Sequence, residues 1–217
     1  MRTVVVLPVK TFSRAKQRLS EAVGEHERRD LAAAMVADVL DALAAVGGLE
    51  AVIVVTAEPL AVAAAEAAGA AVVHDPEEAG QSAAARRGIA AALELGAERV
   101  LAVPGDCPAL DAGQVGALLA REREPGVVIV PDRHGSGTNA LLLAPPDAIA
   151  PSFGVGSFAR HAGRARAAGA AIRVARLASL ELDVDTPEDL AALQAALSAS
   201  AGAPRTRAVL GALPVGH

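Results

Sequence analysis

The sequence contains no tryptophan and no tyrosine, and it has only three phenylalanines in 217 residues. Stacking of bases on aromatic side chains is therefore nearly unavailable, which argues against a protein that binds single-stranded nucleic acid. The net charge of -5 argues in the same direction, because a phosphate backbone attracts basic proteins. We therefore expect no nucleic-acid partner.

Cysteine and long hydrophobic runs are also scarce. The single cysteine, Cys107, excludes an internal disulfide and suits a reducing compartment. We interpret it as a small buried turn residue rather than as a nucleophile. No apolar run approaches the length of a membrane span, and the run at residues 4–7 is too short for a signal peptide. We expect a cytoplasmic protein without a membrane partner.

Apolar residues make up 53% of the chain, so a large aliphatic core is available. Short apolar runs alternate with segments of helical periodicity, which favours an α/β three-layer sandwich with a mostly parallel sheet. An antiparallel insertion is expected around residues 133–145. We expect a single domain over residues 1–198 and a frayed tail rich in Ala, Gly and Pro over residues 199–217. The expected strands lie at residues 4–9, 51–56, 70–73, 100–103, 126–130 and 171–177.

Three carboxylates follow predicted strands. Asp106 comes after the buried run at residues 99–103, and the carboxyl end of a parallel strand is where open α/β sheets place their chemistry. Asp183 and Asp185 alternate in an extended segment and should project to the same side, where they could bind a divalent cation. Alternatively, Asp106 caps the next helix or lies in a turn, and Asp185 or Thr186 is an N-cap with Asp183 in solvent.

Basic residues follow the first strand. Lys10, Arg14, Lys16 and Arg18 could clamp a polyphosphate, or they could belong to a solvated basic loop. Neither GxGxxG nor GxxxxGK[ST] occurs, so side chains and a helix N-terminus would have to hold any phosphate. The helix start at residues 80–82 allows close approach of a ligand, although Ser82 could simply cap that helix.

Two further glycine-punctuated segments lie at residues 133–139 and 153–157. Each could hold an anion with backbone and hydroxyl donors, and the first could instead be a plain hairpin connection. His161 is interpreted as a surface histidine. Together with the carboxylates and the basic loop, these segments favour phosphoryl or nucleotidyl transfer.

A set of motifs follows in order along most of the chain: Val6-Leu7-Pro8-Val9-Lys10 with residues 13–19, Pro104-Gly105-Asp106-Cys107-Pro108, residues 135–139, residues 153–157 and Asp183-Val184-Asp185-Thr186-Pro187. Together these motifs resemble one enzyme family, the guanylyltransferases that make the phosphoester precursor of the F-420 deazaflavin coenzyme. The resemblance implies a Rossmann-like nucleotidyltransferase fold of the nucleotide-diphospho-sugar transferase type, and the use of GTP with Mg²⁺. Such an enzyme joins GMP to the phosphate of a three-carbon phospho-acid and releases pyrophosphate.

The resemblance also implies roles for individual residues. Asp106 would be the main Mg²⁺ ligand, completed by Asp183 and Asp185. The phospho-acid would be held by Thr138, Gly154 and Ser157. The catalytic set would be Asp106 with Lys10, Lys16 and Arg18, whose cationic side chains would face the GTP phosphates. The nucleotide would be bound by Lys10, Lys16, Gly80 and Ser82; related enzymes often have Gly-Leu-Asn where this chain has Gly80-Gln81-Ser82.

Among the three-carbon phospho-acids, we favour phosphoenolpyruvate over 2-phospho-L-lactate and 3-phosphoglycerate. One alternative is another nucleotidyltransferase of this fold, acting on a molybdopterin or a sugar phosphate. Such enzymes usually have a glycine-rich loop after the first strand, and residues 10–19 contain no glycine. The other alternative is a non-catalytic nucleotide-binding module, which has no need of three converging carboxylates. No feature of the sequence indicates an oligomeric state.

Overall fold

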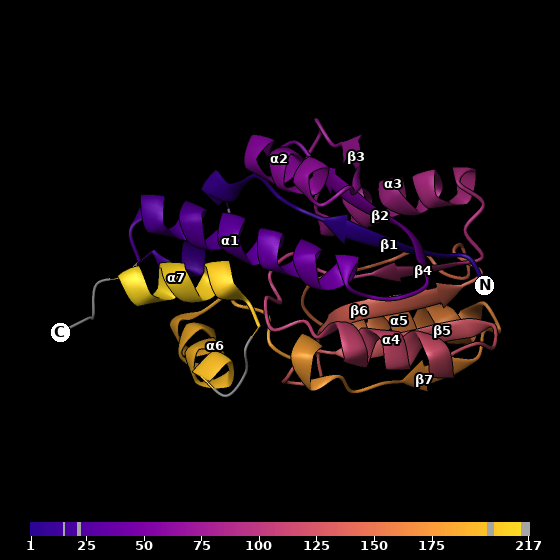
Figure 1. Cartoon of the computed structure of the whole chain (residues 1–217). Coiled ribbons are helices and arrows are strands. Elements are labelled where there is room, and N and C mark those ends of the chain that lie inside the picture. Colours follow the sequence, from indigo (N-terminus) through magenta and orange to yellow (C-terminus); the bar gives the residue numbers. More distant parts are fainter. Residues whose placement is uncertain (15, 21–22, 199–201, 214–217) are drawn as a thin grey trace.

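Seven strands form one mixed sheet in the order β3-β2-β1-β4-β6-β5-β7, and helices cover both of its faces (Figure 1). The computed structural model describes residues 1–14, 16–20, 23–198 and 202–213. The strands are β1 (Thr3–Pro8), β2 (Leu49–Thr56), β3 (Ala71–His74), β4 (Arg99–Ala102), β5 (Gly126–Pro131), β6 (Thr138–Ala144) and β7 (Ile172–Val174). The α-helices are α1 (Glu25–Ala44), α2 (Pro59–Ala67), α3 (Gln81–Glu94), α4 (Ala112–Arg121), α5 (Ser157–Ala167), α6 (Pro187–Ser198) and α7 (Pro204–Ala212). Short 3-10 helices are η1 (Phe12–Arg14), η2 (Gln17–Leu19) and η3 (Ala178–Leu180).

One strand runs against the others. β6 pairs antiparallel with both β4 and β5, whereas all other strand pairs are parallel. The expected α/β architecture and the antiparallel insertion around residues 133–145 are therefore confirmed. The last strand is shorter than predicted, because β7 covers only Ile172–Val174 of the expected 171–177. Since β6 is reversed, its first residues lie at the end of the sheet where the parallel strands have their carboxyl termini.

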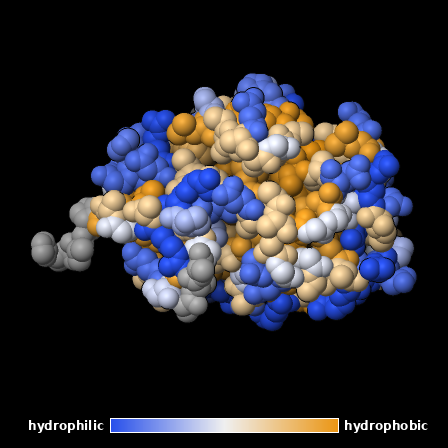
Figure 2. Space-filling model, in the orientation of Figure 1, coloured by the Kyte–Doolittle hydropathy of each residue, from blue (hydrophilic) through white to orange (hydrophobic). Residues whose placement is uncertain are grey.

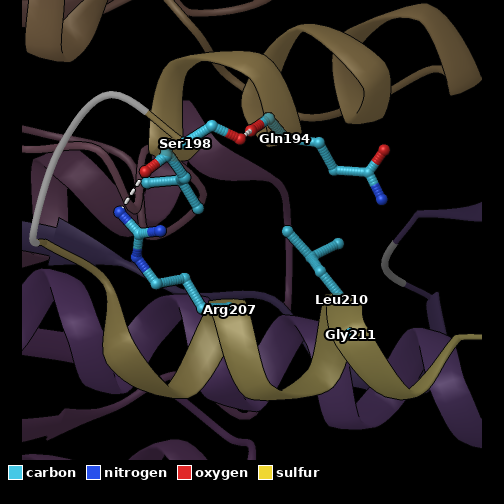
Figure 3. Close-up of a pocket in the computed structure, with 6 residues that line it drawn as sticks. Gln194, Ser198, Arg207, Leu210 and Gly211 are labelled. Atoms are coloured by element: carbon cyan, nitrogen blue, oxygen red, sulfur yellow. Dashed lines mark hydrogen bonds between the residues drawn. The ribbon is translucent and has the colours of Figure 1, made fainter.

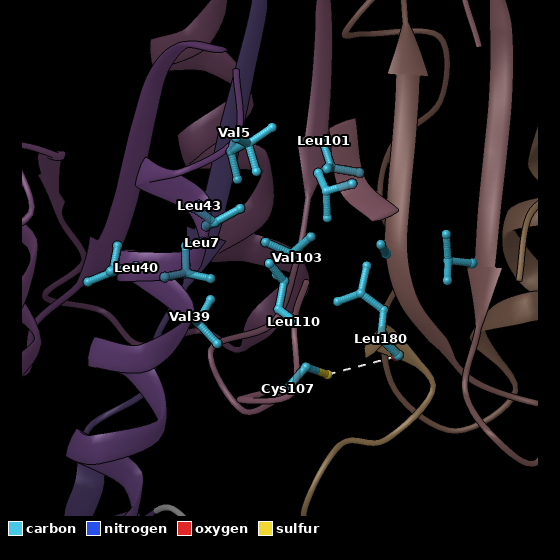
Figure 4. Close-up of a cluster of buried hydrophobic side chains, with 14 of the residues drawn as sticks. Val5, Leu7, Val39, Leu40, Leu43, Leu101, Val103, Cys107, Leu110 and Leu180 are labelled. Atoms are coloured by element: carbon cyan, nitrogen blue, oxygen red, sulfur yellow. Dashed lines mark hydrogen bonds between the residues drawn. The ribbon is translucent and has the colours of Figure 1, made fainter. Parts of the chain in front are cut away.

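Both faces of the sheet are covered by aliphatic side chains. Val5 and Leu7 of β1 pack toward α1, α2 and α4, in the cluster drawn in Figure 4. Val4 and Val6 pack on the opposite face, toward α3 and α5. A glycine permits the close approach of α3, because a Cβ at Gly88 would overlap Val6. This double burial explains why the strands are continuously apolar rather than alternating.

The expectation of a frayed tail after residue 198 is wrong for residues 204–212, which form α7. This helix packs on α1 (Figure 1). The carboxylate of Asp38, which is fully buried on α1, accepts the backbone N–H groups of Arg205 at 3.2 Å and Thr206 at 2.7 Å. It thereby satisfies free N–H groups at the positive end of α7. The remaining tail positions, 199–201 and 214–217, lie outside the described residues.

Within the described part of the chain, no helix is both long and apolar enough to cross a membrane. Hydrophobic and hydrophilic residues are interspersed over the molecular face in Figure 2. This distribution is expected for a chain in which more than half of the residues are apolar.

We expect Asp38→Ala to lower the free energy of unfolding by about 2 kcal/mol, because one buried and one partly buried N–H group of α7 lose their acceptor. Urea denaturation measures this difference. Asp41→Ala is the matched control: Asp41 also contacts Arg205, but its side chain is 55% exposed, and surface ion pairs contribute about 0–1 kcal/mol. Equal losses in the two variants would show that Asp38 does not dock α7.

Candidate active site

A buried lysine lies at the end of the sheet where the central strands β1 and β4 have their carboxyl termini. The Lys16 side chain is only 5% exposed, and its Nζ lies 2.6 Å from Asp106 Oδ2 and 3.4 Å from Asp185 Oδ1. Burial alone lowers the pKa of this ammonium, but the charges of Asp106 and Asp185 outweigh it, so the pKa is raised and Lys16 is protonated. Its backbone is left-handed at φ +56°, which is sterically costly for a residue with a Cβ.

The third predicted carboxylate lies in the same neighbourhood. Asn139, the second residue of β6, donates from Nδ2 to Asp183 Oδ1 at 3.2 Å and to the Leu180 carbonyl at 2.8 Å. Burial raises the pKa of Asp183, and the nearby charge of Asp106 raises it further. The structure therefore brings together carboxylates that are far apart in the sequence.

The segment before α6 alternates as predicted. Leu182 and Val184 are buried, whereas Asp183 and Asp185 are more accessible. Thr186 is the N-cap, because its Oγ1 accepts the N–H of Asp189 at 3.2 Å. Asp189 in turn accepts the N–H groups of Asp185 at 3.1 Å and Thr186 at 2.7 Å. This reciprocal cap fixes the backbone that carries the carboxylate of Asp185.

Asp106 does not cap α4, although it does lie in a turn, which was the other possibility considered for it. The cap is Asp111, whose Oδ1 accepts the N–H of Gln114 at 2.8 Å. Cys107 is buried, and its Sγ lies 3.9 Å from the Leu180 carbonyl (Figure 4). Burial, together with the charge of Asp106, raises the thiol pKa well above its usual range. Cys107 is thus the buried turn residue that the sequence predicts.

Among the described residues, no group of three or more His, Cys, Asp or Glu side chains is arranged to hold a metal ion. Two carboxylates nevertheless meet at one point, because Asp106 and Asp185 share the Lys16 ammonium. A small hard cation needs only one or two carboxylates when substrate phosphates supply the other oxygens. The donor chemistry at this point therefore fits such a cation.

Two other cationic side chains of the basic loop form no ion pair with Asp106, Asp183 or Asp185 in the part of the chain that the structure describes. Lys10 and Arg18 are exposed, and neither forms a hydrogen bond or ion pair within the described residues. The loop itself is anchored by contacts that the sequence analysis missed. The N–H of Phe12 donates to the buried Glu58 at 2.8 Å, and that of Thr11 donates to Glu78 at 3.0 Å. The Arg14 side chain lies outside the described part of the structure.

At the start of α3, Gly80 is the N-cap, with a φ of +97°, and no side chain caps the helix. Ser82 does not cap it; instead, its Oγ accepts the N–H of Phe153 at 2.8 Å. This hydrogen bond connects the helix start to the segment at residues 153–157. The predicted ligand-binding segments at residues 80–82 and 153–157 are therefore in direct contact.

The segment at residues 153–157 leads into α5, where the prediction of a surface histidine is wrong. His161 is fully buried. Its Nδ1 lies 3.0 Å from Thr138 Oγ1, and its Nε2 accepts the N–H of Ser152 at 2.8 Å. Packing of α5 against the sheet buries this position, which local sequence cannot reveal. The spacing of Ser157 and His161, i and i+4 on one helix face, is the signal that could have suggested a shared role.

Ser157 has a hydroxyl with no hydrogen-bond partner among the described residues, although the residue is only 1% exposed. Its own N–H donates to the Gly154 carbonyl, and the next N–H, of Phe158, donates to the Ser136 carbonyl. These two helix-start amides are therefore occupied, whereas the Ser157 hydroxyl is not. Gly154, with a φ of +98°, forms the exposed turn beside them.

A separate pocket lies between α6 and α7 (Figure 3). It is lined by Gln194, Leu197, Ser198, Arg207, Leu210 and Gly211. None of these is among the sequence-predicted site residues. The candidate site is therefore the end of the sheet where β1 and β4 end and β6 begins, around Lys16 and Thr138, and not this pocket. We call this end of the sheet the rim.

Comparisons with known proteins show the family to which the chain belongs. Residues 3–197 match the family model described as "Guanylyl transferase CofC like". A phosphoenolpyruvate guanylyltransferase from Conexibacter woesei is 50% identical over 216 residues, covering 98% of this chain and 97% of that protein. A 3-phospho-D-glycerate guanylyltransferase from Phenylobacterium zucineum is 40% identical over 188 residues, covering 85% of this chain and 86% of that protein.

A solved nucleotidyl transferase from Methanothermobacter superimposes with a TM-score of 0.65 at 20% identity. The match covers 92% of this chain and 99% of that one. At this identity the similarity shows the fold alone. The nucleotidyltransferase fold expected from the sequence is therefore confirmed.

Burial, with smaller contributions from Arg164 and Arg160, lowers the pKa of His161 to about 4. A histidine in the unfolded chain has a pKa of about 6.5. The neutral, buried His161 therefore contributes its full share to the stability of the folded state above pH 6.5, and this contribution is lost as the pH falls toward 4. We expect His161 to reduce the free energy of unfolding by about 2 kcal/mol between pH 7.5 and pH 5. Urea denaturation at both pH values, compared with His161→Asn, isolates this contribution; equal pH dependence in both proteins would contradict it.

Proposed function

The chain belongs to the CofC-like guanylyl transferase family, and we propose that it transfers GMP from GTP to phosphoenolpyruvate with release of pyrophosphate. The enolpyruvyl-diphosphoguanosine formed would be the phosphoester precursor of the F-420 deazaflavin coenzyme. The relative from Conexibacter woesei, which is 50% identical, is named phosphoenolpyruvate guanylyltransferase. The observation that carries the proposal is the meeting of Lys16, Asp106 and Asp185 at the rim that also holds the buried hydroxyls of Thr138 and Ser157.

The nucleotide would bind on the side of the rim formed by β1 and α3. Lys16 supplies a fixed positive charge, and Lys10 and Arg18 are exposed cations on the same loop. Gly80 and Ser82 lie at the start of α3, where helix-start amides favour a phosphate group. These features support the assignment of the GTP triphosphate to this side.

The phospho-acid would bind on the side formed by β6 and α5. Thr138 and Ser157 are the two buried hydroxyls, and Gly154 leaves room for a ligand to approach. A phosphate oxygen of the acid attacks the α-phosphorus of GTP, and the bond from this phosphorus to the oxygen bridging to the β-phosphorus breaks. Because the attacking oxygen is already ionised at neutral pH, the chain needs only to position the reactants and to stabilise charge.

We propose that Asp106 and Asp185, with Asp183 close by, hold Mg²⁺ when substrates bind. This ion would neutralise phosphate charge during the transfer. Asp106 is the central ligand, since it contacts Lys16 and also raises the pKa of Asp183. Lys16 and the ion would then share the negative charge of the carboxylates and the phosphates.

We expect Asp106→Asn to lower kcat/KM by at least about 100-fold, because the change removes one negative charge from the proposed cation site. The measurement is pyrophosphate release from GTP with phosphoenolpyruvate, and ATP, 2-phospho-L-lactate and 3-phosphoglycerate are tested in parallel. Asp111→Asn is the control, because asparagine caps a helix about as well as aspartate. Undiminished turnover by Asp106→Asn would refute the metal assignment, and faster turnover with 3-phosphoglycerate would refute the proposed acceptor.

In the absence of nucleotide, the Lys16 ammonium competes with any cation for Asp106 and Asp185. We expect Lys16→Met to bind Mg²⁺ at least about tenfold more tightly, since the carboxylates lose their neutralising partner. Isothermal titration with Mg²⁺ alone gives the Kd without relying on activity. Arg18→Met, which removes an exposed cation from the same loop, should leave the Kd unchanged. An equal or weaker affinity in Lys16→Met would show that Mg²⁺ binds elsewhere.

A further inference from the structure

His161 lies on the β6 and α5 side of the rim, where the phospho-acid, the proposed acceptor of GMP, would bind; we call this the acceptor side. Its ring joins the helix α5 to the start of β6 and to the loop before α5. It lies on α5 one turn after Ser157, so both side chains lie on the same face of the helix. Its ring contacts Thr138 at the start of β6 and the N–H of Ser152 in the preceding loop. It also meets the Phe153 ring edge-on, with centroids 5.2 Å apart.

The hydrogen bonds define the tautomer of the ring. The backbone N–H of Ser152 can only donate, so Nε2 of His161 must accept and carries no proton. A neutral imidazole then has its proton on Nδ1, which faces Thr138 Oγ1 at 3.0 Å. His161 therefore donates, and the Thr138 oxygen accepts.

This direction determines what Thr138 offers to a ligand. A hydroxyl that accepts from His161 keeps its own proton for a second partner. The opposite tautomer would take that proton and leave only lone pairs facing an anion. Ser157, whose hydroxyl has no partner within the described chain, is the second donor on the same side.

We propose that His161 is a positioning residue that turns the Thr138 hydroxyl into a hydrogen-bond donor for the phospho-acid; this rests on the function proposed above. By holding the N–H of Ser152, the same ring also fixes the loop that carries Gly154. That loop continues to the N–H of Phe153, which donates to Ser82 at the start of α3. His161 thus connects the acceptor side with the nucleotide side without touching either substrate.

The first test measures the ring itself. Nitrogen-15 NMR of the full-length protein, with the His161 signal assigned by its loss in His161→Asn, should show a protonated Nδ1 and an unprotonated Nε2 between pH 6 and pH 8. A proton on Nε2, or a charged ring in this range, would overturn the proposal. This readout does not depend on turnover, so it stands or falls separately from the proposed reaction.

The second test is a double-mutant cycle on steady-state kinetics. We expect His161→Phe to raise the KM for phosphoenolpyruvate at least tenfold and the KM for GTP less than threefold. Thr138→Val should do the same, and the double variant should be no worse than either, because the first change disturbs the orientation of the Thr138 hydroxyl and the second removes the same hydroxyl. Fully additive effects would overturn the proposal. Absence of pyrophosphate release by the wild type with every phospho-acid would instead refute the proposed function.

Asparagine provides the conservative rescue, since its amide nitrogen can replace Nδ1 as a donor to Thr138 but cannot replace Nε2 as the acceptor for Ser152. We expect His161→Asn to recover at least half of the loss in KM seen with His161→Phe. Thermal unfolding of each variant identifies any that fail to fold, and Thr138→Val retains the buried histidine in that case. No recovery in a folded His161→Asn protein would show that the donor to Thr138 is not what His161 contributes.

Discussion

The ion pairs of Lys16 with Asp106 and Asp185 are the contacts on which the rim of this protein depends. They join residues 90 and 169 positions apart in the sequence. A buried ammonium without a counter-charge is strongly unfavourable, so the loop after β1 is held where the carboxylates are. The same constraint holds the end of β4 and the segment before α6 beside each other. The charge centre of the site is therefore also a structural tie between three segments.

Side-chain to backbone hydrogen bonds extend this tie around the rim. Glu58 and Glu78 hold the loop after β1, and Ser82 holds the loop before α5. On the other side, Arg133 of the β5–β6 connection pairs with Asp189 at 2.6 Å. Rigid support of this kind preorganises charged and polar groups, so that little reorganisation is needed when reactants bind. The reaction proposed here requires little else, because its nucleophile is already ionised.

The same region also concentrates features that oppose folding. Lys16 has a left-handed backbone, Asp183 has a raised pKa, and Ser157 has a buried hydroxyl without a partner in the described chain. Each is unfavourable in the isolated protein. A bound cation would offset the raised pKa of Asp183, and a bound phosphate would give the Ser157 hydroxyl a partner. Stabilisation comes from elsewhere, chiefly from the two aliphatic clusters that cover the sheet.

The sequence by itself determined most of the strands and helices and the placement of the carboxylates after strands, because continuous apolar runs, caps and the alternation around Asp183 and Asp185 act locally. Residue patterns also indicated two loops that could hold an anion, at residues 133–139 and 153–157. Only the tertiary structure decided that His161 is buried, that Ser82 holds a distant loop and that residues 204–212 form a helix. It also separated Lys16, held by carboxylates, from the exposed Lys10 and Arg18. These outcomes depend on partners far along the chain: a buried Asp38 on α1 for α7, a hydroxyl on β6 for His161, and paired charges for Lys16. Local pattern does not encode such pairings.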